Sequence, residues 1–495
     1  MRYVIALDQG TTSSRSIVFD EKGRIVSSHA IEFTQHYPQP GWVEHNPEDI
    51  LQTQISALQI AVQKAGIDVH DIVCVGITNQ RETTLLWEKD TGRAVYPAIV
   101  WQCRRTAAQV EKLFGEGLEG MIRAKTGLTP DAYFSATKIQ WIMQNVEGVS
   151  KRAKAGEICF GTVDTFLAFH LTQQHVHVTD PSNASRTMLY NIYDGCWDEE
   201  LLQLLDIPEQ ILPSVVDSSG VIGNLREDIL GIPIPIAALA GDQHAALFGQ
   251  ACFDLGMVKT TYGTGGFLLM NTGDSPIRSE RGLLTTIAWS IDGKREYALE
   301  GSIFVAGALI QWLRDELGLI KEAAESEKLA LSVPDANGAI IVPAFTGLGA
   351  PYWDMYARGT ILGLTRGVSK AHLVRAALEA IAYQTADVIS AMEKDSGVRL
   401  PQMRADGGAS QNNFLMQYQA DILGIQVLRP KVTETTALGA ALLAGLACGV
   451  WADKKQIESV WEQDVYFSPQ RDSAWRSASL QLWHKAVERS RDWAQ

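Results

Sequence analysis

The sequence is poor in cysteine, in long apolar runs and in leader-like segments. Its six cysteines include no C-x-x-C pair, which predicts reduced thiols in an intracellular, cytoplasmic protein, each a small buried hydrophobe. The chain reaches Asp8 too early to fit a signal peptide. Its most apolar late stretch, 437–452, is rich in Gly and Ala and shorter than the roughly 20 residues of a membrane span. We therefore expect a buried helix there and no integral membrane protein.

Basic residues are also in the minority. Lys and Arg number 43 against 57 Asp and Glu, a formal charge of -14, which argues against a nucleic-acid partner. Small phosphate ligands are not excluded, because Mg²⁺ and backbone N–H groups neutralise them locally. There is no G-x-x-x-x-G-K-[ST] loop and no protein-kinase catalytic loop.

The remaining composition is that of a globular protein, with 46% apolar and 20% charged residues in 495 positions. The short apolar run at 3–7 and two further predicted strands at 16–19 and 24–27, with turns between them, predict a β-meander. A helix is expected between Asn46 and Gly66, and a buried strand at 72–77. This order predicts an α/β protein with a mixed sheet covered by helices.

The strand, Gly/Thr turn and strand pattern recurs at 258–270, where Gly263-Thr264 repeats Gly10-Thr11. Two halves that share one plan are therefore expected, with a boundary near 245–255.

Two polar segments in the first 90 residues follow predicted strands. Residues 8–15 (DQGTTSSR) combine a carboxylate with hydroxyls, an arginine and a turn whose N–H groups suit phosphate; a simple polar hairpin is the alternative. Residues 79–84 (NQRETT) offer donors and an acceptor for neighbouring hydroxyls, or else an exposed loop ion pair.

Two more such segments lie later in the chain. In residues 239–246 (LAGDQHAA), Asp242 stands at a strand–helix junction, as an N-cap or as a catalytic carboxylate, and His244 is expected to be structural. Residues 405–412 (ADGGASQN) let a flat ligand approach the backbone, and Asn412 could bind a purine edge or ribose.

The order of these segments resembles that of the FGGY family of carbohydrate kinases, within the actin/hexokinase-like superfamily. The resemblance covers nearly the whole chain, and its branch that phosphorylates glycerol is the most similar. The most specific strings are ALDQGTTSSR (6–15), GITNQRETT (76–84), IVWQCRR (99–105), GTVDT (161–165), ASRTM (184–188) and PAFTGLGAPYW (343–353), with YFSATK (133–138) and 363–379 similar to two family signatures.

The resemblance implies two actin-like, ribonuclease H-like domains, 1–250 and 251–495, with a nucleotide cleft between them. It implies ATP-dependent phosphorylation of glycerol to sn-glycerol 3-phosphate, in glycerol catabolism, by a homodimer or homotetramer. Asp242 would be the general base and Asp8 would help to hold Mg²⁺. The implied polyol-binding residues are Arg81, Glu82, Trp101, Tyr133, Asp242 and Gln243. The implied ATP-binding residues are Thr11, Thr12, Ser13, Arg15, Thr264, Gly307, Gln311, Gly408 and Asn412.

Two segments depart from the family pattern. Residues 224–233 (NLREDILGIP) carry two acids where many relatives bind fructose 1,6-bisphosphate through a Gly/Lys/Arg-rich loop, and they contain no phosphorylatable histidine. We expect weak or absent inhibition by that sugar phosphate. The segment 464–466 differs from the acidic stretch with which some relatives dock a sugar-transport protein.

Two alternatives stay open at this stage. One is a kinase of a pentulose, tetritol or other sugar in the same family. The other is an actin-like nucleotide switch without catalysis, against which Asp242 and the Arg81-Glu82 pair speak, since a switch needs no polyol pocket.

Overall fold

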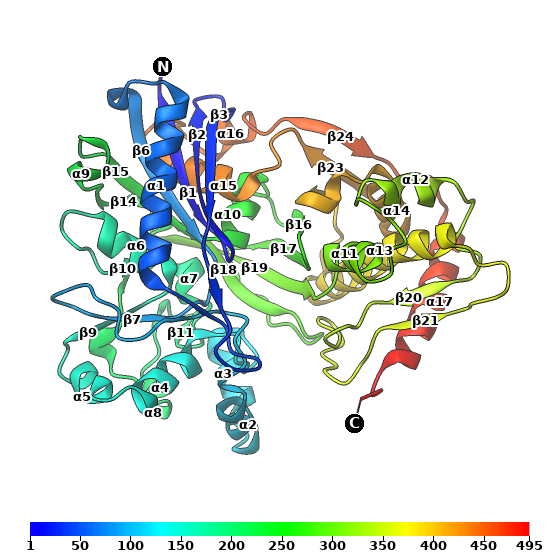
Figure 1. The fold of residues 1–495 in the computed structure, drawn as a ribbon, viewed down its shortest axis with the longest axis horizontal. Helices are drawn as coiled ribbons and strands as arrows, with labels where there is room; N and C mark the ends of the chain where they lie inside the picture. The colour runs from blue at the N-terminus through cyan, green and yellow to red at the C-terminus, as the bar shows by residue number, and fades with distance from the viewer. Residues whose placement is uncertain (495) are drawn as a thin grey trace.

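A computed structural model describes residues 1–494, and its main feature is one 13-stranded mixed sheet (Figure 1). The strands in spatial order are β24 (Gln463–Phe467), β23 (Gln426–Pro430), β22 (Gln402–Asp406), β16 (Val258–Tyr262), β17 (Gly266–Gly273), β19 (Lys294–Ile303), β18 (Leu284–Ile291), β14 (Ser219–Asn224), β15 (Pro235–Gly241), β6 (Ile72–Asn79), β1 (Tyr3–Gln9), β2 (Ser13–Asp20) and β3 (Ile25–Glu32). The predicted mixed α/β sheet is confirmed.

The sheet contains the same arrangement twice. β1 pairs antiparallel with β2 and parallel with β6, which pairs parallel with β15. β16 likewise pairs antiparallel with β17 and parallel with β22, which pairs parallel with β23. Both Gly/Thr turns thus join the first two strands of equivalent units, as the repeat in the sequence predicted. The boundary between 1–250 and 251–495 stays a prediction.

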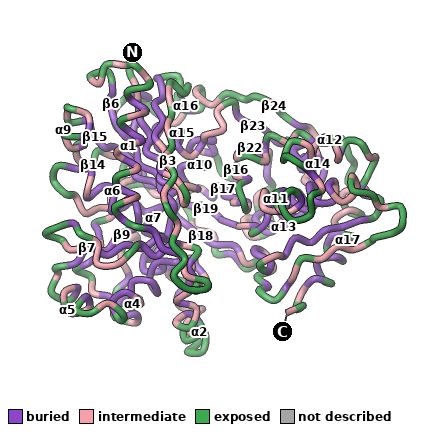
Figure 2. The backbone as a smooth tube through the Cα atoms, viewed as in Figure 1, coloured by how far each residue is buried: buried purple, intermediate pink, exposed green. Residues whose placement is uncertain are grey.

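Helices cover both parts of the sheet, and Figure 2 shows buried strands beneath an exposed outer layer. In the first half they are α1 (Pro47–Ala65), α2 (Ala107–Gly115), α3 (Glu119–Thr126), α4 (Ser135–Asn145), α5 (Val149–Lys154), α6 (Val163–Leu171), α7 (Pro181–Ala184), α8 (Glu199–Leu204), α9 (Glu227–Leu230) and α10 (Asp242–Gly249). In the second half they are α11 (Gly307–Asp315), α12 (Glu325–Leu331), α13 (Lys370–Ser396), α14 (Asn413–Leu423), α15 (Thr435–Ala447), α16 (Lys454–Glu458) and α17 (Ser473–Ser490). None of these helices, within residues 1–494, is both long and apolar enough to cross a membrane.

The residues predicted to begin and end α1 do so in the structure. The Asn46 side chain accepts a hydrogen bond from the Glu48 N–H, and Gly66 ends the helix in the left-handed region at φ 62°. The predicted helix at 437–452 is buried but ends at Ala447.

The prediction that each cysteine is buried was wrong at Cys196, which is exposed on the short strand β12 (Cys196–Trp197), and Cys448 is half-exposed.

Two helices join the halves. α15 follows β23 in the second half, yet it packs against α10 and against β6, β1 and β15 of the first (Figure 1). The close approach depends on glycine, because a Cβ at Gly439 would overlap the Ala245 carbonyl and one at Gly249 the Thr435 carbonyl. The core that surrounds these helices includes strand residues from both halves.

Gly439→Ala is expected to destabilise the protein by about 1–3 kcal/mol, since the new methyl group meets backbone that cannot rotate away. Urea denaturation would measure the loss. Gly120→Ala in α3 is the matched control, because open space surrounds Gly120 and alanine favours a helix. Equal stability of the two variants would show that α10 and α15 need no glycine contact.

Candidate active site

Three parallel neighbours, β1, β6 and β15, end side by side. Gln9 and Gly241 both lie in register with Asn79, so the residues around these strand ends meet at one edge of the sheet. Asp8, Arg81 and Asp242 come from the three strand ends. This edge is where open α/β sheets bind ligands.

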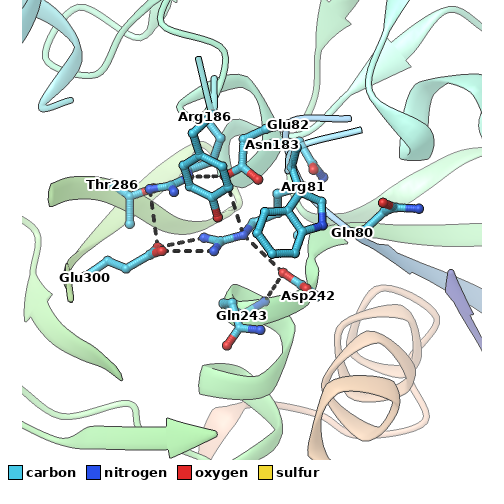
Figure 3. A network of polar contacts seen from close by, with 12 residues as sticks. Gln80, Arg81, Glu82, Asn183, Arg186, Asp242, Gln243, Thr286 and Glu300 are labelled. Atoms are coloured by element: carbon cyan, nitrogen blue, oxygen red, sulfur yellow. Dashed lines mark hydrogen bonds and ion pairs between the residues drawn. The ribbon is translucent and has the colours of Figure 1, made fainter. Parts of the chain in front are cut away.

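Arg81 is the centre of a buried polar network (Figure 3). Its Nη1 and Nη2 donate to the two carboxylate oxygens of Glu300 at 2.6 and 2.9 Å, and its Nε lies 3.1 Å from Asp242 Oδ1. The alternative of an exposed ion pair in the 79–84 loop is wrong, because Arg81 and Glu82 are 3% and 1% exposed. One guanidinium thus holds the candidate base and a carboxylate from the second half.

The Glu82 side chain is buried beside Arg81, and an unusual backbone conformation and a second arginine hold it there. Its φ of 60° lies in the left-handed region, which a glutamate occupies only where the surroundings enforce it. Arg186 Nε donates to Glu82 Oε1 at 2.6 Å, and Arg186 Nη1 lies 3.4 Å from Glu300. Burial raises the pKa of Glu82, against the opposing effect of Arg186 and Arg81.

Glu300 and Arg186 are the site residues to which the sequence analysis gave no role. Arg186 stood in a family-like string, whereas Glu300 lies within a strand of ordinary pattern. It is 219 positions from Arg81, and only the fold brings the two together. Burial opposes ionisation of Glu300, but Arg186 and Arg81 outweigh it and hold its pKa far below the usual range.

Trp101 and Tyr133 line the same region. Their rings meet edge to face with centroids 5.6 Å apart, and Trp101 Nε1 donates to Thr11 Oγ1 at 2.9 Å. Trp101 therefore connects the predicted polyol residues with the first Gly/Thr turn. Tyr133 is close enough to Glu82 that burial and this carboxylate raise the pKa of its phenol.

Asp242 is the first residue of α10, and Gly241 occupies the N-cap position, so the N-cap interpretation of Asp242 is wrong. Its Oδ1 accepts from the Gln243 N–H at 2.7 Å and pairs with Arg81. Its Oδ2 accepts no hydrogen bond from residues 1–494, and the side chain is 31% exposed.

His244 is buried, with Nε2 3.1 Å from Thr286 Oγ1, as expected of a structural residue.

The first Gly/Thr turn is closed by a hydrogen bond from the Gly10 N–H to the Ser13 carbonyl at 2.9 Å. Thr11 and Ser13 are half-buried and Thr12 is exposed. Arg15, on β2 just after this turn, pairs with Glu434, the residue before α15, so this region also contacts the second half. The pKa of Asp8 is raised to about 7. Burial is the main cause, Arg15 opposes it, and the negative charges of Asp242 and Glu434 add to it.

The second Gly/Thr turn meets the start of α11. The Thr264 carbonyl accepts from the Ala306 and Ala308 N–H groups at 2.9 and 3.0 Å, and Gly307 N–H donates to Gly263. A Cβ at Gly307 would lie 2.5 Å from the Gly263 carbonyl oxygen, which requires glycine. Thr264 and Gly307 are thus neighbours, and Gln311 is exposed one turn further along α11.

Gly408 begins a short 3-10 helix, Gly408–Gln411, which contacts β16, the strand that leads into this second turn, and Asn412 follows it. The adjoining Gly407 packs against the Tyr262 backbone so closely that a Cβ would overlap it, and Gly408 is exposed. Asn412 is the N-cap of α14: its Oδ1 accepts from the Leu415 N–H at 2.9 Å and its Nδ2 donates to Ser326 at 3.2 Å. The predicted nucleotide residues thus divide into two groups, one at the first Gly/Thr turn and one on the second turn and on the segments that begin α11 and α14.

The part of the chain that is described contains no group of three or more His, Cys, Asp or Glu residues able to hold a metal by themselves. Mg²⁺ commonly binds one or two carboxylates together with substrate phosphates. Asp8, beside the first turn and near Asp242, fits that role.

Comparison with known proteins agrees with this architecture. Family models for the N-terminal and C-terminal domains of the FGGY carbohydrate kinases match residues 3–249 and 258–448. Curated relatives include a glycerol kinase of Thermoanaerobacter sp. (strain X514), 59% identical, and glycerol kinase 2 of Thermotoga maritima, 60% identical; each alignment covers 100% of this chain and 99% of the relative.

Solved structures show the same fold. The glycerol kinase of Plasmodium falciparum with ADP superposes with a TM-score of 0.94 at 35% identity, covering 99% of this chain and 98% of that one. A xylulose kinase of Lactobacillus acidophilus, at 24% identity, superposes with a TM-score of 0.89 over 99% of this chain and 97% of its own. One sheet that contains the same strand arrangement twice, a buried polar network where β1, β6 and β15 end, and family matches over both halves lead to one conclusion: the chain belongs to the FGGY family of carbohydrate kinases.

Proposed function

We propose that this chain transfers the γ-phosphoryl group of ATP to a terminal hydroxyl of glycerol, giving sn-glycerol 3-phosphate and ADP. The observation that carries the proposal is the placement of Asp242. One carboxylate oxygen is fixed by Arg81 and the Gln243 N–H, and the other accepts no hydrogen bond from residues 1–494. The full-length similarity to glycerol kinases supports glycerol as the substrate.

The pocket suits a small polyol because it pairs polar groups with aromatic faces. Arg81, Glu82 and Gln243 supply donors and acceptors for hydroxyls (Figure 3). Trp101 and Tyr133, whose rings meet edge to face, can cover the carbon chain. Buried hydrogen-bonding groups discriminate against analogues that lack a hydroxyl, since these groups would remain unpaired.

The mechanism needs little covalent chemistry from the protein, because positioning and neutralisation of charge lower most of the barrier to phosphoryl transfer. Asp242 Oδ2 takes the proton of the terminal hydroxyl as its oxygen attacks the γ-phosphorus in line. Thr11, Thr12, Ser13 and Arg15 hold the phosphates on one turn, and Thr264, Gly307, Gln311, Gly408 and Asn412 hold the nucleotide on the other. Bound Mg²⁺, held through Asp8, would neutralise phosphate charge.

The proposal also includes a cytoplasmic location and a homodimer or homotetramer. Inhibition by fructose 1,6-bisphosphate is proposed to be weak or absent, and the charges of the 224–233 segment support this. Its only basic side chain, Arg226, is already paired with Asp228 at 2.7 Å, and Glu227 adds a second negative charge.

The test is release of ADP by the purified protein with glycerol, xylulose, erythritol or no acceptor, in a coupled assay with Mg²⁺. Glycerol is expected to give the highest kcat/KM, because the polar groups of the pocket match its hydroxyls. Preference for xylulose or erythritol would assign the chain to another branch of the family. ATP turnover independent of any polyol would support the actin-like switch instead.

A further inference from the structure

Lys259, on β16 of the second half, is fully buried, and its ammonium group reaches Gln243 of the first half. Its Nζ donates to Gln243 Oε1 at 2.5 Å, to Thr261 Oγ1 at 3.0 Å and to the Phe267 carbonyl at 3.5 Å. Among residues 1–494, no carboxylate lies within ion-pair distance of this ammonium group. All three hydrogen-bond partners of this ammonium group are neutral, and burial lowers its pKa while the more distant Asp406 opposes that shift. Burying a charge without an ionic partner is costly, which indicates a role beyond packing.

The contact with Gln243 decides which way its amide faces. The two ends of an amide have nearly the same shape, so the partners determine its orientation. A protonated lysine has donors and no acceptor, and therefore only the oxygen of the amide can face it. Nε2 then faces away from Lys259. No residue in the described part of the chain accepts a hydrogen bond from Nε2, and this atom is not among the fully enclosed polar atoms without partners.

We propose that Lys259 is a positioning residue that fixes the Gln243 amide with its NH₂ group directed at the polyol, so that a strand of the second half completes the pocket of the first. The inference rests on the proposed function, in which Gln243 binds glycerol. An NH₂ group fixed in this direction can donate a hydrogen bond to a hydroxyl oxygen of the polyol. Without Lys259 the amide can turn over, and it can then present its oxygen instead of its NH₂ group to the polyol.

Lys259→Met is the main variant. Its KM for glycerol is expected to rise about 3- to 10-fold, the effect of one misdirected neutral hydrogen bond, with kcat and the KM for ATP within about 2-fold of the parent. In a Gln243→Ala background the same substitution should leave the glycerol KM unchanged, because Lys259 acts through Gln243. Lys125→Met is the control for a general loss of stability. It also removes a lysine that pairs with a buried carboxylate, but Lys125 lies in α3 and does not contact Gln243.

Two results would overturn the inference. An unchanged glycerol KM in Lys259→Met would mean that the amide keeps its orientation without the lysine. A lower kcat that persists in the Gln243→Ala background would mean that Lys259 acts directly on the transferred phosphoryl group. Absence of glycerol-dependent ADP release in the parent protein would refute the proposed function instead, so the two failures can be told apart.

Gln243→Glu gives an answer even if Lys259→Met does not fold. Its carboxylate can pair with Lys259 but has no NH₂ group to offer the polyol. Its glycerol KM is expected to rise as far as that of Gln243→Ala. A parental KM in Gln243→Glu would show that the NH₂ group does not bind the polyol, which would refute the inference.

Discussion

Asp242→Asn is expected to lower glycerol-dependent turnover by about 10²–10⁴-fold, the usual range for loss of a general base. The amide keeps the size of the side chain and can still accept from the Gln243 N–H, but it cannot take the proton of the attacking hydroxyl. Since Asp242 acts in the transition state, kcat should fall with little rise in the KM for ATP. A steady-state assay of ADP release measures both constants.

Asp472→Asn is the matched control, because Asp472 caps α17 far along the chain and asparagine caps a helix equally well. It should keep parental turnover. If Asp242→Asn also kept near-parental turnover with its fold intact, by circular dichroism, Asp242 would not be the base. The proton would then have to leave by another route.

Glu300→Gln is expected to lower the free energy of unfolding by about 3–5 kcal/mol, because it leaves the buried Arg81 and Arg186 guanidinium groups with one carboxylate fewer. It should also raise the glycerol KM, since Arg81 loses its bidentate partner while it pairs with Asp242. Urea denaturation and steady-state kinetics would follow the two effects separately.

Glu296→Gln provides the comparison for this substitution. Glu296 lies on the same strand, β19, and pairs with Lys454, but that contact is partly exposed and remote from Arg81. It should change stability by no more than about 1 kcal/mol and leave the glycerol KM unchanged. Similar losses in both variants would show that the Glu300 network has no special role.

Local structure follows from short-range signals in the sequence. Asn46 and Gly66 bound α1 because a side-chain acceptor and a left-handed glycine act within a few residues of the chain. The two Gly/Thr turns were predicted for the same reason, as were their neighbouring strands. Asp242 shows the limit: the sequence predicted the strand–helix junction, but only the backbone shows that Gly241 is the cap.

By itself, the sequence determined the alternation of strands and helices, the repeated plan and the family, because these depend on local periodicity and on ordered motifs. The tertiary structure decided what surrounds Arg81 and Gln243. Glu300 and Lys259 reach them from strands of the second half, 219 and 16 positions away. Such pairing depends on how strands align across a sheet, and nothing in the pattern of β16 or β19 distinguishes these two charged residues from others that face solvent.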